Sequence, residues 1–180
     1  MEEWKTNILE NLLECIIDYR GKTPNKTDKG VPLITAKIVK GGIIQTPNEF
    51  ISNEDYRSWM VRGFPERGDV VLTTEAPLGE VAQIENENIA LAQRIVTLRG
   101  KKYVLDNTYL KYFFLSKIGK GRLIARETGT TVTGIKQTEL RQVEITYPKY
   151  EVQKRIASIL SSLDDKIAIN RRINDNLRSN

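Results

Sequence analysis

The chain has 180 residues, of which 39% are hydrophobic and 28% charged, a composition typical of a globular protein rather than a disordered one. It contains no histidine and one cysteine, Cys15, which together exclude a structural zinc site, an intramolecular disulfide and the commonest general base. No apolar run approaches the roughly 20 residues that cross a membrane. We interpret Cys15 as a small buried hydrophobe and expect a reducing, cytoplasmic setting.

The net charge of +5 is concentrated in two stretches. Residues 20–40 contain six Lys or Arg against one Asp, and residues 111–126 contain five Lys or Arg and no acidic residue. Clustered positive charge suits a phosphate backbone or an acidic protein partner. The alternative is two solvated faces whose acidic neighbours lie close in space, and the charges favour nucleic acid without excluding that alternative.

The first half of the chain is predicted to be a helix followed by short strands. Apolar spacing over residues 8–17 favours a helix capped by Asn7, and a loop rich in Gly, Pro, Asn and Lys follows it. Strands are predicted at residues 31–38 and 42–45, with a turn at Gly41-Gly42. Residues 52–60 are predicted to be a short helix capped by Ser52.

The second half is predicted to alternate strands and helices up to Pro148. Strands are expected at residues 70–73, 80–84 and 90–98, and a helix capped by Asn107 at residues 107–118, with its aromatic residues on a buried face. Residues 128–136 form a Gly/Thr loop whose hydroxyls and backbone donors suit phosphates or base edges, or simply form a turn. A short helix at 139–143 and a strand at 144–147 follow.

Residues 151–180 are predicted to be one long helix. Apolar residues at Ile156, Leu160, Leu163 and Ile167 are separated by steps of four, three and four, and the same alternation continues through Asn170, Asn174 and Leu177. A 3.5-residue spacing is typical of helices that pack lengthwise against a partner helix. The two asparagines would fix the register of such a pair, or they mark a frayed helix end. We therefore predict an α+β protein with a mixed or antiparallel sheet in a globular domain, residues 1–148, and a helical arm, residues 149–180.

The sequence contains no convincing catalytic constellation. It lacks a GxGxxG or Walker-type loop and the Asn/Asp-Pro-Pro-Tyr/Phe tetrapeptide of amino-methyltransferases. Asp69 and Glu80 are ordered as in a metal-dependent nuclease, but Gln83 stands where such a site needs lysine. The sequence therefore favours a binding protein over an enzyme.

Several stretches, taken in order, resemble the specificity subunits of type I restriction–modification systems. They are WKTNILENLLECIIDYRGKTP, VPLITAKIVKGG, RGDVVLTTEAPLGEVA, IALAQRIVTLR and the segment from NTYLKYFFL to LDDKI. The last is the most specific, because a Gly/Thr loop, a short helix and a strand ending in proline precede Glu151-x-Gln153 at the start of the long helix.

The resemblance implies that residues 1–148 are a target recognition domain that reads half of a split DNA site. Residues 149–180 would be the helix that spaces two such domains, pairs antiparallel and docks modification subunits. The chain itself would catalyse nothing and bind no cofactor. Partner modification subunits would methylate adenine with S-adenosylmethionine, and restriction subunits would use ATP and Mg²⁺. Family members typically contain two recognition domains and two long helices, so we expect a second copy of this chain to complete the assembly as a homodimer.

The expected duplex DNA contacts come from the two basic stretches and the Gly/Thr loop. They are Lys22, Asn25, Lys26, Lys29, Lys37, Lys117, Lys120, Arg122, Arg126, Thr130, Thr131, Thr133 and Lys136. Most lysines are expected to hold phosphates, whereas bases are read by Arg, Asn or a Thr methyl. The favoured base readers are therefore Arg122, Arg126, Asn25 and Thr131.

The expected contacts with a partner helix are the residues of the 3.5-residue seam, namely Ile156, Leu160, Leu163, Ile167, Asn170, Asn174 and Leu177. Two other functions compete with the specificity subunit. One is a stand-alone small enzyme that modifies or cleaves DNA, and turnover of DNA by the lone protein would identify it. The other is a basic adaptor that binds an acidic protein, and competition by generic duplex DNA would separate it from a DNA-binding module.

Overall fold

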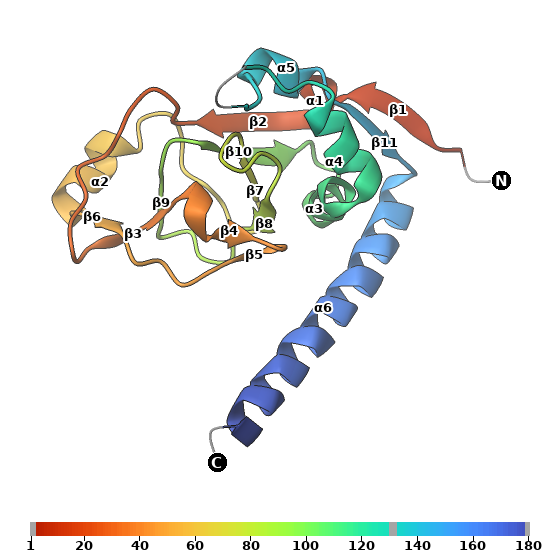
Figure 1. Ribbon diagram of the computed structural model, residues 1–180. Coiled ribbons are helices and arrows are strands. Elements are labelled where there is room, and N and C mark those ends of the chain that lie inside the picture. Colours follow the sequence, from red (N-terminus) through yellow and green to blue (C-terminus); the bar gives the residue numbers. More distant parts are fainter. Residues whose placement is uncertain (1–2, 130–132, 179–180) are drawn as a thin grey trace.

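A computed structural model describes residues 3–129 and 133–178. Figure 1 shows a globular domain from which one long helix projects, with the chain's N-terminal end near the point where that helix leaves the domain. The elements are β1 (Lys5–Ile8), α1 (Leu9–Leu12), β2 (Leu13–Asp18), β3 (Val31–Ile34), η1 (Ala36–Ile38), β4 (Val39–Lys40), β5 (Ile43–Ile44), β6 (Phe50–Ile51), α2 (Asn53–Trp59), β7 (Val70–Thr73), β8 (Val81–Gln83), β9 (Ala90–Leu91), β10 (Ile95–Gly100), α3 (Asn107–Leu115), α4 (Lys117–Ile124), α5 (Gln137–Arg141), β11 (Glu144–Tyr147) and α6 (Tyr150–Arg178).

The centre of the domain is an antiparallel sheet in the order β2-β10-β7-β8. Its side chains alternate between two cores, because successive residues of a strand point to opposite faces. Val70 and Leu72 face a core built with α3, α4, α5 and the start of α6. Val71 faces a second core built with β3, β9 and the end of α2. The sheet is therefore buried on both faces, which explains the unbroken apolar run of β7.

Smaller strand pairs surround this sheet. β3 pairs antiparallel with β6 and parallel with β9, and β4 and β5 form a hairpin across Gly41-Gly42. β1 pairs antiparallel with β11, which immediately precedes α6. The first strand of the chain thus anchors the base of the long helix. Among the described residues, no helix is long and apolar enough to cross a membrane.

Several local predictions are confirmed. Ser52 caps α2, since its Oγ accepts a hydrogen bond from the Asp55 backbone N–H at 3.0 Å. β7 occupies residues 70–73 as predicted, the turn lies at Gly41-Gly42, and β11 ends just before Pro148. Cys15 is half-buried against the second core, and burial raises the pKa of its thiol.

The helix predicted at residues 8–17 is wrong. This segment is β1, a single helical turn α1, and β2. β1 pairs with β11 and β2 pairs with β10, partners about 80 to 140 positions away along the chain. Apolar spacing that fits a helix was overridden by these distant strand partners, because a segment's strand preference depends on the surface that it packs against.

Three other boundaries also differ from prediction. The strand expected at 90–98 breaks into β9 and β10, which join different sheets, with Arg94 at a positive φ of 71° between them. The strand expected at 31–38 ends at Ile34, and η1 follows. The helix expected at 107–118 ends at Leu115 and is capped by Asp106, and α4 then covers part of the second basic stretch, where no second helix was predicted.

Candidate nucleic-acid interface

The Gly/Thr loop is held at its base by strand-like hydrogen bonds. Thr128 and Gly134 exchange two backbone hydrogen bonds of 2.7 and 3.0 Å, and the Ile135 N–H donates to the Thr74 carbonyl at 2.9 Å. A Cβ on Gly134 would lie only 2.8 Å from that same carbonyl oxygen, so glycine is required for this close approach. Thr133 is exposed, whereas the predicted contacts Thr130 and Thr131 lie outside the described residues.

Three arginines outside the set of predicted DNA contacts are linked to the base of this loop. We call them the arginine rim: Arg20, Arg62 and Arg94. Arg20 ion-pairs with Asp18 and donates from Nη1 to the Ile135 carbonyl at 2.7 Å. Its backbone carbonyl in turn accepts from Arg62 Nη1 at 3.0 Å. The rim is thereby fixed to the same backbone that carries the loop.

Arg94 joins the rim through the turn after β7. Its Nε lies 2.9 Å from Glu75 Oε1, and Glu75 forms a β-bridge with Gly134. The Arg94 side chain remains 53% exposed. Three arginines far apart in sequence are therefore linked, directly or through one neighbour, to one loop. They form no cluster in the sequence, so the sequence alone did not identify them. The positive φ of Arg94 is likewise a feature that only the structure reveals.

Four lysines of the basic stretches and the Gly/Thr loop are free to meet a ligand. Lys22, Lys29, Lys117 and Lys136 are exposed, and within the described residues none forms an ion pair. Lys22 follows Arg20 by two residues, and Lys136 follows Ile135, whose carbonyl Arg20 contacts, so both lysines add positive charge near the rim. The arrangement can bind phosphate oxygens through exposed ammonium groups and present guanidinium groups in fixed positions.

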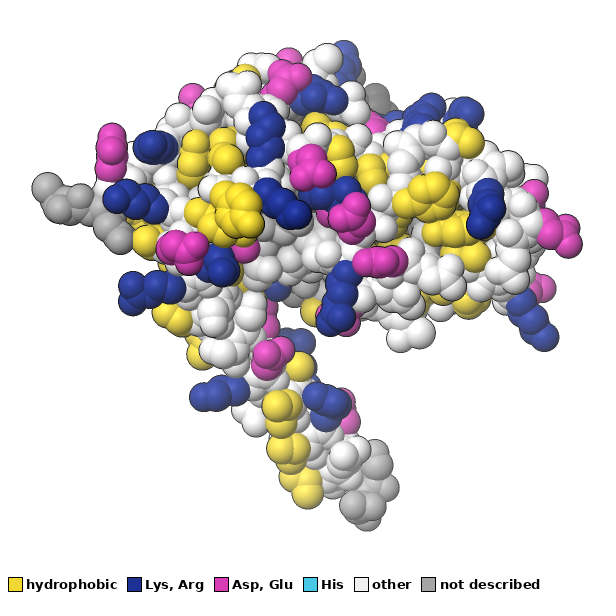
Figure 2. All heavy atoms as spheres, turned by 180° about the vertical axis from the view of Figure 1, so that it is seen from behind, with side chains coloured by type: hydrophobic (Ala, Val, Ile, Leu, Met, Phe, Trp, Pro, Cys, Tyr) yellow, Lys and Arg dark blue, Asp and Glu magenta, His cyan; other side chains and the backbone are white. Residues whose placement is uncertain are grey.

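Other predicted contacts already have partners inside the domain. Lys26 and Lys37 both lie near Glu49, at 2.7 and 3.8 Å, and Lys120 lies 3.9 Å from Glu80. Acidic neighbours close in space thus neutralise part of each basic stretch. Figure 2 shows the same mixture over one face of the domain, where Lys and Arg are interspersed with Asp and Glu.

The two arginines favoured as base readers are also engaged. Arg126 Nη1 lies 3.0 Å from Glu139 Oε2. Arg122 Nη1 donates to the Glu144 carbonyl at 2.8 Å and to Thr146 Oγ1 at 3.0 Å, and its guanidinium lies over the Phe113 ring. Arg122 therefore holds α4 against β11. Both arginines therefore already have partners within the domain, unlike the exposed lysines.

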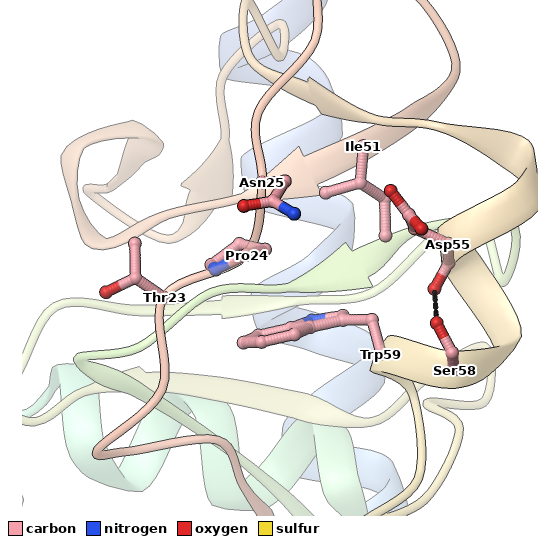
Figure 3. A pocket seen from close by; sticks show the side chains of 7 residues that line it. All are labelled: Thr23, Pro24, Asn25, Ile51, Asp55, Ser58 and Trp59. Carbon is pink, nitrogen blue, oxygen red and sulfur yellow. Dashed lines mark hydrogen bonds between the residues drawn. The ribbon is translucent and has the colours of Figure 1, made fainter.

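The first basic loop borders a shallow pocket of about 160 Å³ at the end of the domain remote from α6. Figure 3 shows Pro24 and Asn25 on one side of the pocket and Ile51 and Asp55 on the other, with the Trp59 ring below them in this view. Trp59 is held rigidly, because its ring stacks on Tyr19 at 5.4 Å and its Nε1 donates to the Leu91 carbonyl at 3.0 Å. The pocket offers an aromatic surface, an exposed amide and a carboxylate.

The carboxylates considered for metal binding have structural roles. Asp69 is buried and receives two hydrogen bonds of 2.8 Å from the Arg99 guanidinium, and this contact raises the pKa of Arg99. Glu80 accepts a hydrogen bond from the Gly41 N–H at 2.9 Å. Among residues 3–129 and 133–178, no group of three or more His, Cys, Asp or Glu is placed to hold a metal ion.

One buried amide attaches α6 to the domain. Gln153 is fully buried, accepts from the Asp106 N–H at 2.9 Å, and donates to the carbonyls of Val104 and Pro148 at 2.9 and 3.0 Å. Ala157, one turn later, is also buried. Gln153 of the Glu-x-Gln motif therefore has a structural role.

A second attachment lies farther along the helix. The Tyr112 hydroxyl donates to Asp164 Oδ2 at 2.7 Å, and Lys111 Nζ lies 3.5 Å from the same oxygen. Burial raises the pKa of Tyr112 to about 12. A groove of about 680 Å³, lined partly by Tyr112 and Asp164 and partly by the β4–β5 hairpin, separates this part of α6 from the domain. Asp164 thus marks the last side-chain hydrogen bond between domain and arm in the described residues.

The predicted seam of α6 is only partly exposed. Ile156 packs against the first core and Leu160 is half-buried, whereas Leu163, Ile167, Asn170, Asn174 and Leu177 are exposed. Three further exposed apolar residues were missed: Ile159, Ile169 and Ile173. Figure 2 shows apolar side chains running down the projecting part of the helix, flanked by charged ones. Ile159 and Ile173 fall on a second 3.5-residue series with Leu163 and Leu177, and this spacing was the signal that could have revealed them.

Comparison with known proteins gives one family. The model of the type I restriction modification DNA specificity domain matches residues 1–179. The MjaIX specificity subunit of Methanocaldococcus jannaschii is 33% identical over 125 residues, covering 69% of this chain and 28% of that protein. The MjaVIII specificity subunit of the same organism is 26% identical over 178 residues, covering 95% and 42%. The chain therefore spans less than half the length of these relatives.

Solved structures share the fold. The HsdS subunit of Thermoanaerobacter tengcongensis superposes with a TM-score of 0.63 at 22% identity, covering 94% of this chain and 39% of that one. A chain solved to explain complex assembly and conformational transition of the type I R-M system gives 0.69 at 20% identity, covering 94% and 40%. With the family match over nearly its whole length, this chain belongs to the type I restriction–modification DNA specificity domain family.

Proposed function

We propose that this chain recognises one half of a split duplex DNA site as the specificity component of a type I restriction–modification enzyme. The observation that carries the proposal is the arginine rim beside the Gly/Thr loop, with Lys22 and Lys136 exposed close to it along the chain. Positive groups fixed at a loop suit a DNA backbone with accessible base edges. The names of the relatives support the same reading.

The unpaired lysines and the rim have different roles in this proposal. Lys22, Lys29, Lys117 and Lys136 hold phosphates, which orient the duplex without selecting its sequence. Arg62 and Arg94 are the preferred base readers, because each is exposed and is held through one nitrogen only, Nη1 in Arg62 and Nε in Arg94. The other two nitrogens of each guanidinium can donate two parallel hydrogen bonds to guanine. Asn25 and Thr133 are exposed and remain candidates for DNA contacts. Four other predicted contacts would have to leave their glutamate partners before they could bind DNA, namely Lys26, Lys37, Lys120 and Arg126.

Residues 1–148 act as the recognition domain, and residues 149–180 act as the spacer that pairs with a second copy and docks modification subunits. The chain binds no cofactor in this proposal. S-adenosylmethionine, ATP and Mg²⁺ are used by the partner modification and restriction subunits, in the cytoplasm where the DNA lies. The buried ion pair of Asp69 with Arg99 supports a non-catalytic role, because it removes the carboxylate that a metal-dependent nuclease would need.

The test is selection from a random duplex DNA library by the purified full chain, followed by sequencing of the bound DNA. We expect a split motif with two inverted, equal halves. Arg94→Ala should relax the preference at one position of each half, with a loss of about 1–3 kcal/mol for the preferred base pair. Arg57→Ala, which removes an exposed arginine of α2, is the matched control. No enrichment of any motif would contradict the proposal, and cleavage or methylation of DNA by the lone chain would favour a small enzyme instead.

A further inference from the structure

We propose that the shallow pocket beside Trp59 binds a single nucleobase that has turned out of the DNA helix. This site rests on the proposed function, the binding of duplex DNA at the arginine rim, and adds a second site with a different ligand chemistry. Figure 3 shows the residues that line the pocket. They come from the loop at residues 23–25 and from the segment that runs from β6 through α2, residues 51–59.

Both walls of the pocket are held in place by the fold. The loop that carries Asn25 is fixed to the chain around β6, because the Thr27 N–H donates to the Phe50 carbonyl at 2.9 Å and Lys26 Nζ lies 2.7 Å from Glu49 Oε2. The other wall is α2, whose first turn has a side-chain cap. A pocket that is formed before its ligand arrives avoids much of the cost of ordering on binding.

Trp59 gives the pocket a fixed aromatic surface. The residue is half-buried, its ring stacks on Tyr19 with the centroids 5.4 Å apart, and its Nε1 donates to the Leu91 carbonyl at 3.0 Å. Aromatic side chains bind bases of any sequence, because every base has a π-face. The pocket therefore offers the contact that unstacked bases use most.

Three polar side chains of the pocket have no hydrogen-bond partner within the described parts of the chain. Asn25 has a free amide, Asp55 a free carboxylate and Thr23 a free hydroxyl, and all three residues are exposed. An amide both donates and accepts, whereas an ionised carboxylate only accepts. The carboxylate favours a base with an amino group, which cytosine, adenine and guanine have and thymine lacks.

The size of the pocket limits the ligand to one small group. Its volume is about 160 Å³, below the roughly 300–1,000 Å³ of pockets that hold drug-sized ligands. A base inside a duplex is stacked on its neighbours and cannot enter a concave site. The ligand is therefore a base that has left the stack.

The pocket is joined to the arginine rim through Tyr19. The Tyr19 ring stacks on Trp59, its hydroxyl accepts from the Arg62 N–H at 2.9 Å, and the Arg62 guanidinium lies 5.9 Å from the ring centroid. Lys22, exposed and without an ion pair in the described residues, directly precedes the pocket loop. This positive charge favours a phosphate chain. It disfavours the main alternative ligand, a cationic side chain that Trp59 and Asp55 could also accept.

The test is a binding titration of the full chain carrying Trp4→Phe, which leaves Trp59 as the only tryptophan. The probes are a fully paired duplex and a series of the same duplex with one unpaired cytosine at successive positions, because an unpaired base costs least to bring out of the stack. At one position we expect binding about fivefold tighter or more, with quenching of the Trp59 fluorescence. An unpaired thymine at that position should bind about tenfold more weakly than the cytosine.

Asp55→Asn tests the role of the carboxylate while it keeps the shape of the side chain. The ratio of cytosine to thymine affinities should fall toward one. Glu54→Gln is the matched control, because Glu54 is an exposed carboxylate of the same helix that does not line the pocket. That variant should keep the wild-type ratio.

Four results would overturn the inference. Equal affinity for the paired and unpaired duplexes at every position, with unchanged Trp59 fluorescence, would do so and leave the proposed function standing. A wild-type ratio in Asp55→Asn would exclude this pocket as the base site. Quenching by an arginine-containing peptide, but not by the unpaired duplexes, would assign the pocket to a protein ligand. Absence of binding to every duplex would overturn this inference and the proposed function together, so the two failures can be told apart.

Discussion

Gln153 offers the sharpest test of how the arm is held, because one buried side chain makes three hydrogen bonds to two separate backbone segments, residues 104–106 and Pro148. It accepts from the N–H of Asp106, the N-cap of α3, and donates to the carbonyls of Val104 and Pro148. Replacing it with alanine removes all three hydrogen bonds and leaves their backbone partners in a buried position. We therefore predict a large loss of stability from Gln153→Ala.

The magnitude follows from the number of bonds. Each net hydrogen bond contributes about 1 kcal/mol, so three give about 3 kcal/mol, and an orphaned buried group makes the loss larger rather than smaller. For a domain of this size, that corresponds to a fall in Tm of about 6–12 °C. Gln153→Met keeps most of the volume and separates the hydrogen bonds from packing. Lys154→Ala, on the exposed side of the same turn, is the control and should change stability by less than about 0.5 kcal/mol.

The assay is urea unfolding followed by circular dichroism, with the free energy of unfolding extrapolated to water. We expect Gln153→Ala and Gln153→Met to lose similar amounts, because hydrogen bonding dominates. A loss below about 1 kcal/mol for both variants, with an unchanged denaturant slope, would refute the reasoning that these bonds hold the base of α6.

Three further predictions test the arm, the core and the interface. Asp164→Asn should loosen the attachment of the arm to α3 and broaden the distance distribution between spin labels on domain and arm, whereas Asp165→Asn should not; equal distributions would contradict this. Burial raises the pKa of Tyr109 to about 12, so the folded state retains a proton that the unfolded state loses near pH 10; stability should fall between about pH 10 and 12, and Tyr109→Phe should flatten that fall in unfolding measured against pH. Lys22→Ala with Lys136→Ala should weaken binding to every duplex and reduce the slope of log affinity against log salt by up to about 1.8, and an unchanged slope would exclude these lysines as phosphate contacts.

Local features of the fold could be predicted from the sequence because they depend on neighbours along the chain. The Ser52 cap of α2, the strand at residues 70–73, and the strand that ends at Pro148 before the long helix all follow from spacing, capping and the chemistry of proline. The family could also be recognised from the sequence, because short motifs typical of it occur in the expected order along nearly the whole chain.

Only the tertiary structure determined which strands and side chains pair across long sequence separations. The segment at residues 8–17 became strand because β10 and β11 supply its hydrogen bonds. Arg122, predicted to read bases, instead hydrogen-bonds to β11. Arg62 and Arg94, which were not predicted to contact DNA, are linked to the backbone that carries the Gly/Thr loop. Helix periodicity and capping act over a few residues, but strand pairing and charge pairing depend on which distant groups the fold brings within contact. The long helix shows both: its seam was visible in the sequence, but which of its faces remained free was decided by the domain packed against it.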